Sequence, residues 1–172
     1  MGEPRQRVHV VGATGLDVLR TKIDALTRSR SGHQKREGIL ICQHPCGRPA
    51  AVERALMERL ISVALATKEP VTVIYPNTDR GHSGIVKAIE QAASVSAFRS
   101  LSRDEFLERL LSVRVLLGNS SAGIIEAPFA GTPSINVGER QRGRTPGGRS
   151  VFSCGESIVE IRQPLSKALR TV

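Results

Sequence analysis

The sequence is poor in aromatic residues and has no long hydrophobic run. Phe, Tyr and Trp make up only 3% of the 172 residues, and Trp is absent. A platform for stacking nucleic-acid bases is therefore poorly supplied. No apolar run approaches the roughly 20 residues that a membrane-spanning helix needs. The start, Met1–Arg5, is not followed by the apolar segment of a signal peptide, so we expect a protein without a membrane anchor.

Cysteine is also scarce. Three cysteines give no even disulfide framework, which suits a reducing compartment such as the cytoplasm. Cys42, His44 and Cys46 lie close together in the sequence and suggest a metal site. Such a site needs a fourth ligand, and the spacing is not that of a zinc pair, so we expect no metal.

Acidic residues are outnumbered, with 16 Asp and Glu against 25 Lys and Arg, for a net charge of +9. A basic balance is typical of proteins that bind nucleic acid, a membrane surface or a small acidic ligand. Part of the charge lies in two runs, at 28–36 and 140–149. Nucleic-acid binding would weaken steeply with salt, and the shortage of aromatic residues argues against it. A small anionic ligand fits better.

Short apolar runs alternate with helical patterns, over a length that suits one domain. Strands are predicted at 8–12, 39–42, 71–75, 94–99, 113–117, 134–138 and 150–154. Helices are predicted at 16–26, 50–67, 85–93, 102–111 and 164–169, with Val52, Leu56, Leu60 and Val63 as the apolar face of the second. This alternation predicts an α/β fold with a doubly wound parallel sheet, whose ligand groups gather at the carboxyl ends of the strands.

The first predicted strand leads into Ala13-Thr14-Gly15, which is similar to the start of a dinucleotide-binding loop. The third glycine of that fingerprint would fall at Val18, so the pattern is incomplete. A nicotinamide cofactor is therefore not expected, and no other cofactor is indicated.

The stretch from Gly118 to Pro128 organises the rest of the chain. It follows the strand at 113–117 with a polar loop and a predicted helix N-terminus, which is an arrangement that binds anions. Ser120 and Ser121 can cap the helix or donate hydroxyl groups to a phosphate. Gly123 would allow close approach of a ligand or of another backbone, and Glu126 could meet a ribose. Turn and capping chemistry alone is the structural alternative.

Further candidates also follow predicted strands. His44 precedes Pro45, which restricts it to an extended conformation, and Asn77 lies in a turn. Phe98 ends the strand at 94–99, and Arg140 follows the strand at 134–138. A guanidinium matches a pyrophosphate in shape and charge. Taken singly, His44 and Asn77 suit turn positions and Phe98 suits the core, but their convergence on one edge favours a site.

The run GNSSAGIIEAPFAGTPSINVGERQRGR, residues 118–144, resembles the signature of the UDP-N-acetylglucosamine 2-epimerases. It is most similar to the hydrolysing branch, which makes N-acetylmannosamine and related sugars for sialic-acid-type pathways. His44-Pro45 and Pro76-Asn77 also resemble family segments. The family fold has two Rossmann-like domains facing a cleft, as in the GT-B glycosyltransferases. The resemblance implies that residues 1–172 are the C-terminal, UDP-binding half.

The resemblance also implies roles for single residues. Ser120, Ser121, Gly123 and Arg140 would bind the diphosphate, Glu126 the ribose, Asn77 the nucleotide sugar, and the backbone near Phe98 the uracil. His44 would assist the leaving phosphate or the sugar as the catalytic residue of this half.

The family's carboxylates lie mainly in the first domain, which this chain lacks, so we expect little or no turnover by the chain alone. Its partners would be a UDP-sugar, the missing domain in cis or in trans, and a second copy if it forms a homo-oligomer. Two alternatives remain, namely the nucleotide half of a GT-B glycosyltransferase and a non-catalytic sensor of nucleotide sugars.

Overall fold

The computed structural model describes residues 2–29, 35–145 and 147–171. Part of each basic run, residues 30–34 and residue 146, lies outside the described residues. The chain divides into two compact units, residues 1–32 and 33–172. The second unit holds a six-stranded sheet in which every neighbouring pair of strands is parallel, in the order β3-β2-β1-β4-β5-β6. The predicted doubly wound parallel sheet is therefore confirmed.

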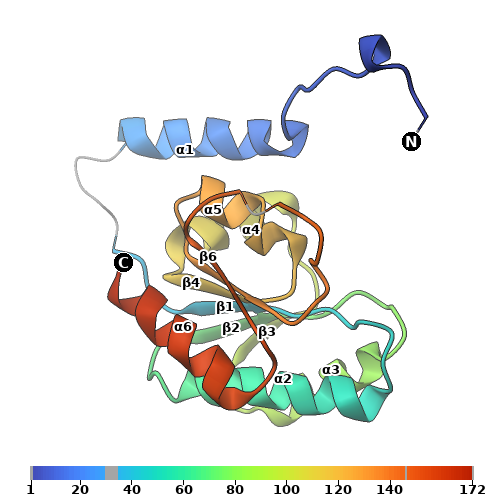
Figure 1. Cartoon of the computed structure of the whole chain (residues 1–172). Helices are drawn as coiled ribbons and strands as arrows, with labels where there is room; N and C mark the ends of the chain where they lie inside the picture. Colours follow the sequence, from blue (N-terminus) through green and yellow to red (C-terminus); the bar gives the residue numbers. More distant parts are fainter. Residues whose placement is uncertain (1, 30–34, 146, 172) are drawn as a thin grey trace. The chain divides into compact units, whose positions relative to one another are not determined.

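The strands are short and mostly buried (Figure 1). They are β1 Ile39–Cys42, β2 Val71–Ile74, β3 Ser96–Phe98, β4 Val115–Gly118, β5 Ser134–Val137 and β6 Val151–Cys154. All four residues of β1, β4 and β5 are buried, as expected for strands covered on both faces. Apolar runs identify β1 and β4, whereas β5 carries the buried polar residues Ser134 and Asn136 between apolar ones.

Helices cover both faces of this sheet (Figure 1). On one face lie α2 Ala50–Leu65, α3 His82–Gln91 and α6 Ile158–Arg170, whose buried side chains form one cluster with Ile41, Leu117 and Ile135. The other face carries α4 Arg103–Ser112, the 3₁₀ turn η3 Ser121–Gly123 and the short helix α5 Glu126–Phe129. Ser102 and Glu105 form a capping box at the start of α4.

Three sequence predictions about elements are wrong in this unit. Helix α3 begins at His82 rather than at Ile85, and α6 begins at Ile158 rather than near Pro164. The start of α6 is fixed by a capping box between Ser157 and Glu160, and Pro164 lies inside the helix. On α2, Val52 is 44% exposed, and the buried face carries Glu53 instead.

The first unit contains η1 Arg5–Arg7, η2 Thr14–Leu16 and α1 Asp17–Ser29. The predicted strand at 8–12 is absent from these described residues, because the segment runs as irregular backbone with Val8, Val10 and Val11 exposed. A short apolar run forms a strand only where a neighbouring strand pairs with it. Among the described residues, none of the helices has the length and apolar character needed to cross a membrane.

Candidate functional site

The sheet changes winding direction between β1 and β4. From β1 the chain proceeds outward to β2 and β3, and it then returns to the other side of β1 to build β4, β5 and β6. In open α/β sheets, ligands bind outside the carboxyl ends of the strands at such a switch point. The residues that follow β1 and β4 are Gln43-His44 and Asn119-Ser120, so two of the predicted site residues lie at this point.

Gly118 brings these two loops into close contact. Its φ is +133°, and a Cβ on this residue would lie 2.3 Å from the carbonyl oxygen of Cys42. The main-chain N–H of Ser120 donates to that same carbonyl oxygen at 3.2 Å. Only glycine satisfies both the dihedral angle and the contact.

Asn119, which is buried, ties three segments together. Its Oδ1 accepts the main-chain N–H of His44 at 2.8 Å, and its Nδ2 donates to the carbonyl oxygen of His44 at 2.8 Å. Its own carbonyl oxygen accepts Nε2 of Gln141 at 2.7 Å and Nη1 of Arg140 at 3.1 Å. His44, Ser120 and Arg140, which sequence analysis placed after three different strands, are therefore brought together around one residue, with His44 on its side chain and Arg140 on its carbonyl oxygen.

The imidazole of His44 has a defined orientation. Its Nδ1 accepts the main-chain N–H of Asn77 at 3.2 Å, so Asn77 joins the same cluster. A main-chain N–H can only donate, which leaves the ring proton of the neutral imidazole on Nε2. Burial lowers the pKa of His44, the charge of Arg140 lowers it further, and Asp79 opposes this shift. His44 is therefore neutral near pH 7, with Nε2 as a hydrogen-bond donor.

We expect His44 to titrate below its ordinary pKa of 6.5 and to carry its proton on Nε2. Because the folded state disfavours the imidazolium, this residue's contribution to stability is present above pH 6.5 and is lost as the pH falls through the folded-state pKa. Imidazole ¹⁵N shifts followed by NMR over pH 4 to 8 measure both properties. A protonated Nδ1 at pH 7 would contradict this assignment.

The serine loop differs from its predicted form. Ser120 caps η3 as expected, because its Oγ accepts the N–H of Ala122, but the helix stops after one turn. In a longer helix, the N–H of residue 128 would donate to the carbonyl oxygen of Ile124, but Pro128 has no N–H. The N–H of Gly147 donates to this oxygen instead, at 2.8 Å. Helices of three and four residues carry little dipole, so anion binding here depends on the serine hydroxyls and Arg140.

Gly123 is buried, and its position for a Cβ faces the sheet. That atom would lie 3.7 Å from the side chains of Leu116 and Ser134. These are ordinary van der Waals distances, so the packing of η3 on β4 and β5 leaves room for a Cβ at Gly123 and does not by itself require glycine.

Glu126 and Phe98 both contact α4 rather than the loop of His44. The carboxylate of Glu126, 16% exposed, accepts Nη1 of Arg103 at 3.0 Å. The guanidinium of Arg109 lies 4.0 Å from the centre of the Phe98 ring. Both arginines belong to α4, so this helix connects the two residues that the resemblance assigns to ribose and uracil.

A salt-bridge network supports the His44 loop, and sequence analysis did not predict it. Glu53, with a fully buried side chain, accepts the N–H of Cys46 at 2.7 Å and both Nε and Nη2 of Arg48 at 3.1 and 3.0 Å. Nη1 of Arg48 also donates to both carboxylate oxygens of Glu156, at 2.9 and 2.7 Å. We call Arg48, Glu53 and Glu156 the arginine clamp.

Two glycines fit closely against the arginine clamp. A Cβ on Gly138 would lie 2.8 Å from Oε1 of Glu156, and one on Gly81 would lie 2.9 Å from Cγ of Glu53. The clamp therefore contacts the segments that follow β1, β2, β5 and β6. Gly138 directly precedes the segment that carries Arg140, so the clamp supports both sides of the candidate site.

The sequence held signals for these additional residues. Glu53 lies three residues before Leu56 and seven before Leu60, on the buried stripe of α2, and a charged residue on such a stripe needs a partner. Asn119 and Gln141 are polar residues inside the recognised signature. No group of three His, Cys, Asp or Glu that could hold a metal ion occurs among the residues that the structure describes.

Comparison with known proteins identifies the family. The sequence model of the UDP-N-acetylglucosamine 2-epimerases matches residues 1–171. A UDP-N-acetylglucosamine 2-epimerase of Neisseria meningitidis is 32% identical over 153 residues, which are 86% of this chain and 40% of that protein. A hydrolysing UDP-N,N'-diacetylbacillosamine 2-epimerase of Legionella pneumophila is 33% identical over 148 residues, 82% of this chain and 39% of that protein.

Solved structures show the same fold. The Methanocaldococcus jannaschii UDP-GlcNAc 2-epimerase in complex with UDP-GlcNAc and UDP superposes with a TM-score of 0.71 at 14% identity, over 98% of this chain and 49% of that one. The Neisseria meningitidis enzyme bound to UDP-GlcNAc gives 0.66 at 17% identity, over 96% and 48%. The chain thus spans about half the length of these structures, and it belongs to the UDP-N-acetylglucosamine 2-epimerase family of enzymes.

Proposed function

We propose that this chain is the UDP-binding, C-terminal half of a hydrolysing UDP-N-acetylglucosamine 2-epimerase. The observation that carries the proposal is the convergence on Asn119, where His44, Ser120 and Arg140 meet at the switch point of the sheet. Hydroxyl, imidazole and guanidinium donors in one place suit a diphosphate. Two of the curated relatives, from Legionella pneumophila and Campylobacter jejuni, are named as hydrolysing enzymes.

Each residue has a task in this proposal. Ser120 and Ser121 donate hydroxyl hydrogen bonds to the phosphates. Arg140 supplies the positive charge, because its guanidinium already lies against the carbonyl oxygen of Asn119, the residue before Ser120. Glu126 accepts ribose hydroxyls, for which it must share or release Arg103. Uracil lies by the backbone at Phe98, and Asn77 contacts the nucleotide sugar.

The chemistry proposed for the complete enzyme is elimination of UDP from UDP-N-acetylglucosamine, followed by addition of water with inversion at C2. Neutral His44 donates from Nε2 to the phosphate oxygen that departs with UDP, which stabilises the charge developing there. The base that removes the C2 proton comes from the other half. This chain alone therefore binds UDP, turns over little substrate, and acts in the cytoplasm, where UDP-sugars are made.

Calorimetric titration of this chain with UDP, UMP and NAD tests the proposal. UDP should bind at least tenfold more tightly than UMP, because the second phosphate adds a charge-assisted contact worth about 1.5–3 kcal/mol. Arg140→Ala should remove most of that preference, and Glu126→Ala should weaken UDP and UMP alike.

Arg142→Ala is the matched control, since exposed Arg142 pairs only with neighbouring Glu139 at 3.6 Å among the contacts found for it. UDP affinity that is unchanged by Arg140→Ala and Glu126→Ala would refute the site assignment. In a separate experiment, this chain is mixed with the N-terminal half of a relative and with UDP-N-acetylglucosamine. The products should be UDP and N-acetylmannosamine, whereas UDP-N-acetylmannosamine as product would assign the chain to the non-hydrolysing branch.

A further inference from the structure

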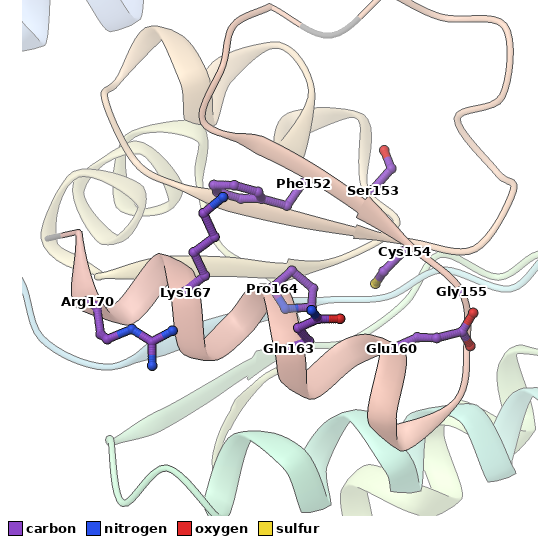
Figure 2. Close-up of a pocket in the computed structure, with 9 residues that line it drawn as sticks. All are labelled: Phe152, Ser153, Cys154, Gly155, Glu160, Gln163, Pro164, Lys167 and Arg170. Atoms are coloured by element: carbon purple, nitrogen blue, oxygen red, sulfur yellow. The ribbon is translucent and has the colours of Figure 1, made fainter.

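A groove lies between β6 and α6 (Figure 2). Its volume of about 540 Å³ is in the range of pockets that hold small molecules. None of the candidate-site residues lines it. The groove is therefore a candidate for a second ligand site, independent of the proposed function.

The middle of the groove is apolar. Phe152 and Cys154 project from β6 toward α6, and Pro164 lines the groove from the helix (Figure 2). Burial raises the pKa of Cys154 to about 11, so its thiol is neutral near pH 7. A ligand that fills this groove therefore needs an apolar body.

The two ends of the groove carry opposite charges. Lining residues recur on α6 at the spacing i, i+3, i+4 and i+7, so they lie along one face of the helix. They are Glu160, Gln163, Pro164 and Lys167. Because an α-helix rises 1.5 Å per residue, Glu160 and Lys167 are roughly 10 Å apart along the axis. Arg170 lines the groove as a second cation, one turn beyond Lys167.

The Glu160 end of the groove accepts hydrogen bonds. Its Oε2 accepts the hydroxyl of Ser157 at 2.6 Å and the N–H of Ser157 at 3.1 Å, and these bonds hold the pKa of Glu160 below its usual value. Within the described part of the chain, Oε1 accepts no hydrogen bond. Pro164 also has no N–H to donate to the carbonyl oxygen of Glu160. An ammonium group of a ligand would supply donors to this end.

The opposite end of the groove donates hydrogen bonds. The Lys167 ammonium lies 5.5 Å from the centre of the Phe152 ring. Neither Lys167 nor Arg170 forms an ion pair with a carboxylate of the described residues. A ligand carboxylate beside Lys167 would therefore meet an available cation, while the atoms next to it pack on Phe152.

We propose that this groove binds a small zwitterion, with an ammonium group and a carboxylate at opposite ends of an apolar chain. The ammonium donates to Glu160, the apolar part packs on Phe152, and the carboxylate accepts from Lys167. A molecule with only one charge makes only one of the two polar contacts. Because each exposed contact contributes little alone, selectivity comes from the two ends together.

Titration of the whole chain with 8-aminooctanoic acid, followed by ¹H–¹⁵N NMR, tests this site. We expect saturable shifts of the amide signals of Gly155, Glu160 and Lys167, with no comparable shift at Ser120. Octanoate and octylamine each lack one of the charges. Each should bind about fivefold more weakly, which corresponds to a loss of about 1 kcal/mol. No saturable shift in the groove, or equal affinities for the three probes, would overturn the proposal.

Two single substitutions assign the charges to their ends. Glu160→Gln keeps the capping box, in which glutamine can replace glutamate, and it should remove the preference for 8-aminooctanoic acid over octanoate. Lys167→Gln should remove most of the preference for 8-aminooctanoic acid over octylamine. Circular dichroism establishes that both variants fold.

Arg162→Gln is the matched control, since it removes a charge from the same helix outside the groove. It should leave the affinities for all three probes unchanged. Equal effects of Arg162→Gln and Lys167→Gln, or unchanged preferences in both groove variants, would contradict a zwitterion site.

Discussion

Arg48→Met is expected to destabilise the β-sheet unit by about 3 kcal/mol or more, because it leaves the carboxylate of Glu53 buried with its principal cation removed. Removal of one partner of a buried pair costs more than the pair itself contributes. Glu53 keeps the N–H of Cys46, but that single donor does not replace two guanidinium bonds. Urea denaturation of the variant and the wild type measures the difference in free energy of unfolding.

The arginine clamp also predicts a dependence of stability on pH. Burial disfavours ionisation of Glu53, but the hydrogen bonds from Arg48 and Cys46 outweigh burial and hold the pKa of Glu53 below its usual value of 4.5. The unfolded chain therefore binds the proton more readily. The stabilisation is fully present above pH 4.5 and is lost as the pH falls through the folded-state pKa, and Arg48→Met should flatten this part of the profile.

Arg54→Met is the matched control, since Arg54 lies on α2 next to Glu53, pairs with Glu58 four residues along and donates to Gln91 at 2.8 Å. Both side chains of that pair are at least 40% exposed, so its loss should cost less than about 1 kcal/mol. If the two variants lose equal stability, Glu53 does not depend on Arg48. Weaker UDP binding by Arg48→Met under folded conditions would show that the clamp positions the His44 loop.

Gly118→Ala is expected to destabilise the unit by about 3 kcal/mol or more, from backbone strain and overpacking together. The new Cβ would lie 2.3 Å from the carbonyl oxygen of Cys42. Gly118 and Cys42 are paired residues of the central strands β4 and β1. Neither strand can move without disturbing its pairing with the other, so the backbone cannot relax to relieve this strain at low cost. Asn119 and Ser120 would shift with the loop, and UDP binding should fall as well.

Gly143→Ala isolates the contribution of the dihedral angle. Gly143 has a φ of +80°, but nothing lies within 4 Å of its Cβ position, so alanine there should cost about 1 kcal/mol. Urea denaturation of Gly118→Ala and Gly143→Ala under the same conditions separates the cost of the steric contact from the cost of the positive φ. Equal losses would mean that the approach of Gly118 to Cys42 is not strained.

The sequence predicted the parallel sheet because β1 and β4 are buried on both faces and read as apolar runs, whereas β5 was found from the apolar residues Ile135 and Val137 after Pro133 although Ser134 and Asn136 are polar. It could not distinguish them from the run at 8–12, since pairing with a neighbour, rather than composition, makes a strand. The sequence also predicted the serine loop, but it did not predict how short the helix after this loop is. That length depends on Pro128 and on the N–H of Gly147, which lies 23 residues beyond Ile124 in the sequence.

Strand ends identify His44, Asn77 and Arg140 as candidates, and the structure brings these three residues into one hydrogen-bonded cluster. Residues that act through tertiary contacts were missed. Glu156 follows the last strand as an ordinary polar residue, and only the folded chain brings it within 2.7 Å of Arg48. Arg103 likewise reaches Glu126 across 23 positions. Long-range pairs of this kind leave no periodic pattern in one sequence.

The carbonyl group of Asn119 has two donors where one would suffice. Gln141 is buried and Arg140 is exposed, so the two bonds differ in how easily they break. If Arg140 binds a diphosphate as proposed, Gln141 still donates to this oxygen, and no buried acceptor is left without a donor. The second donor would thus separate two tasks that a single arginine would have to combine, because Gln141 would hold the loop in place while Arg140 exchanged the carbonyl oxygen for the ligand.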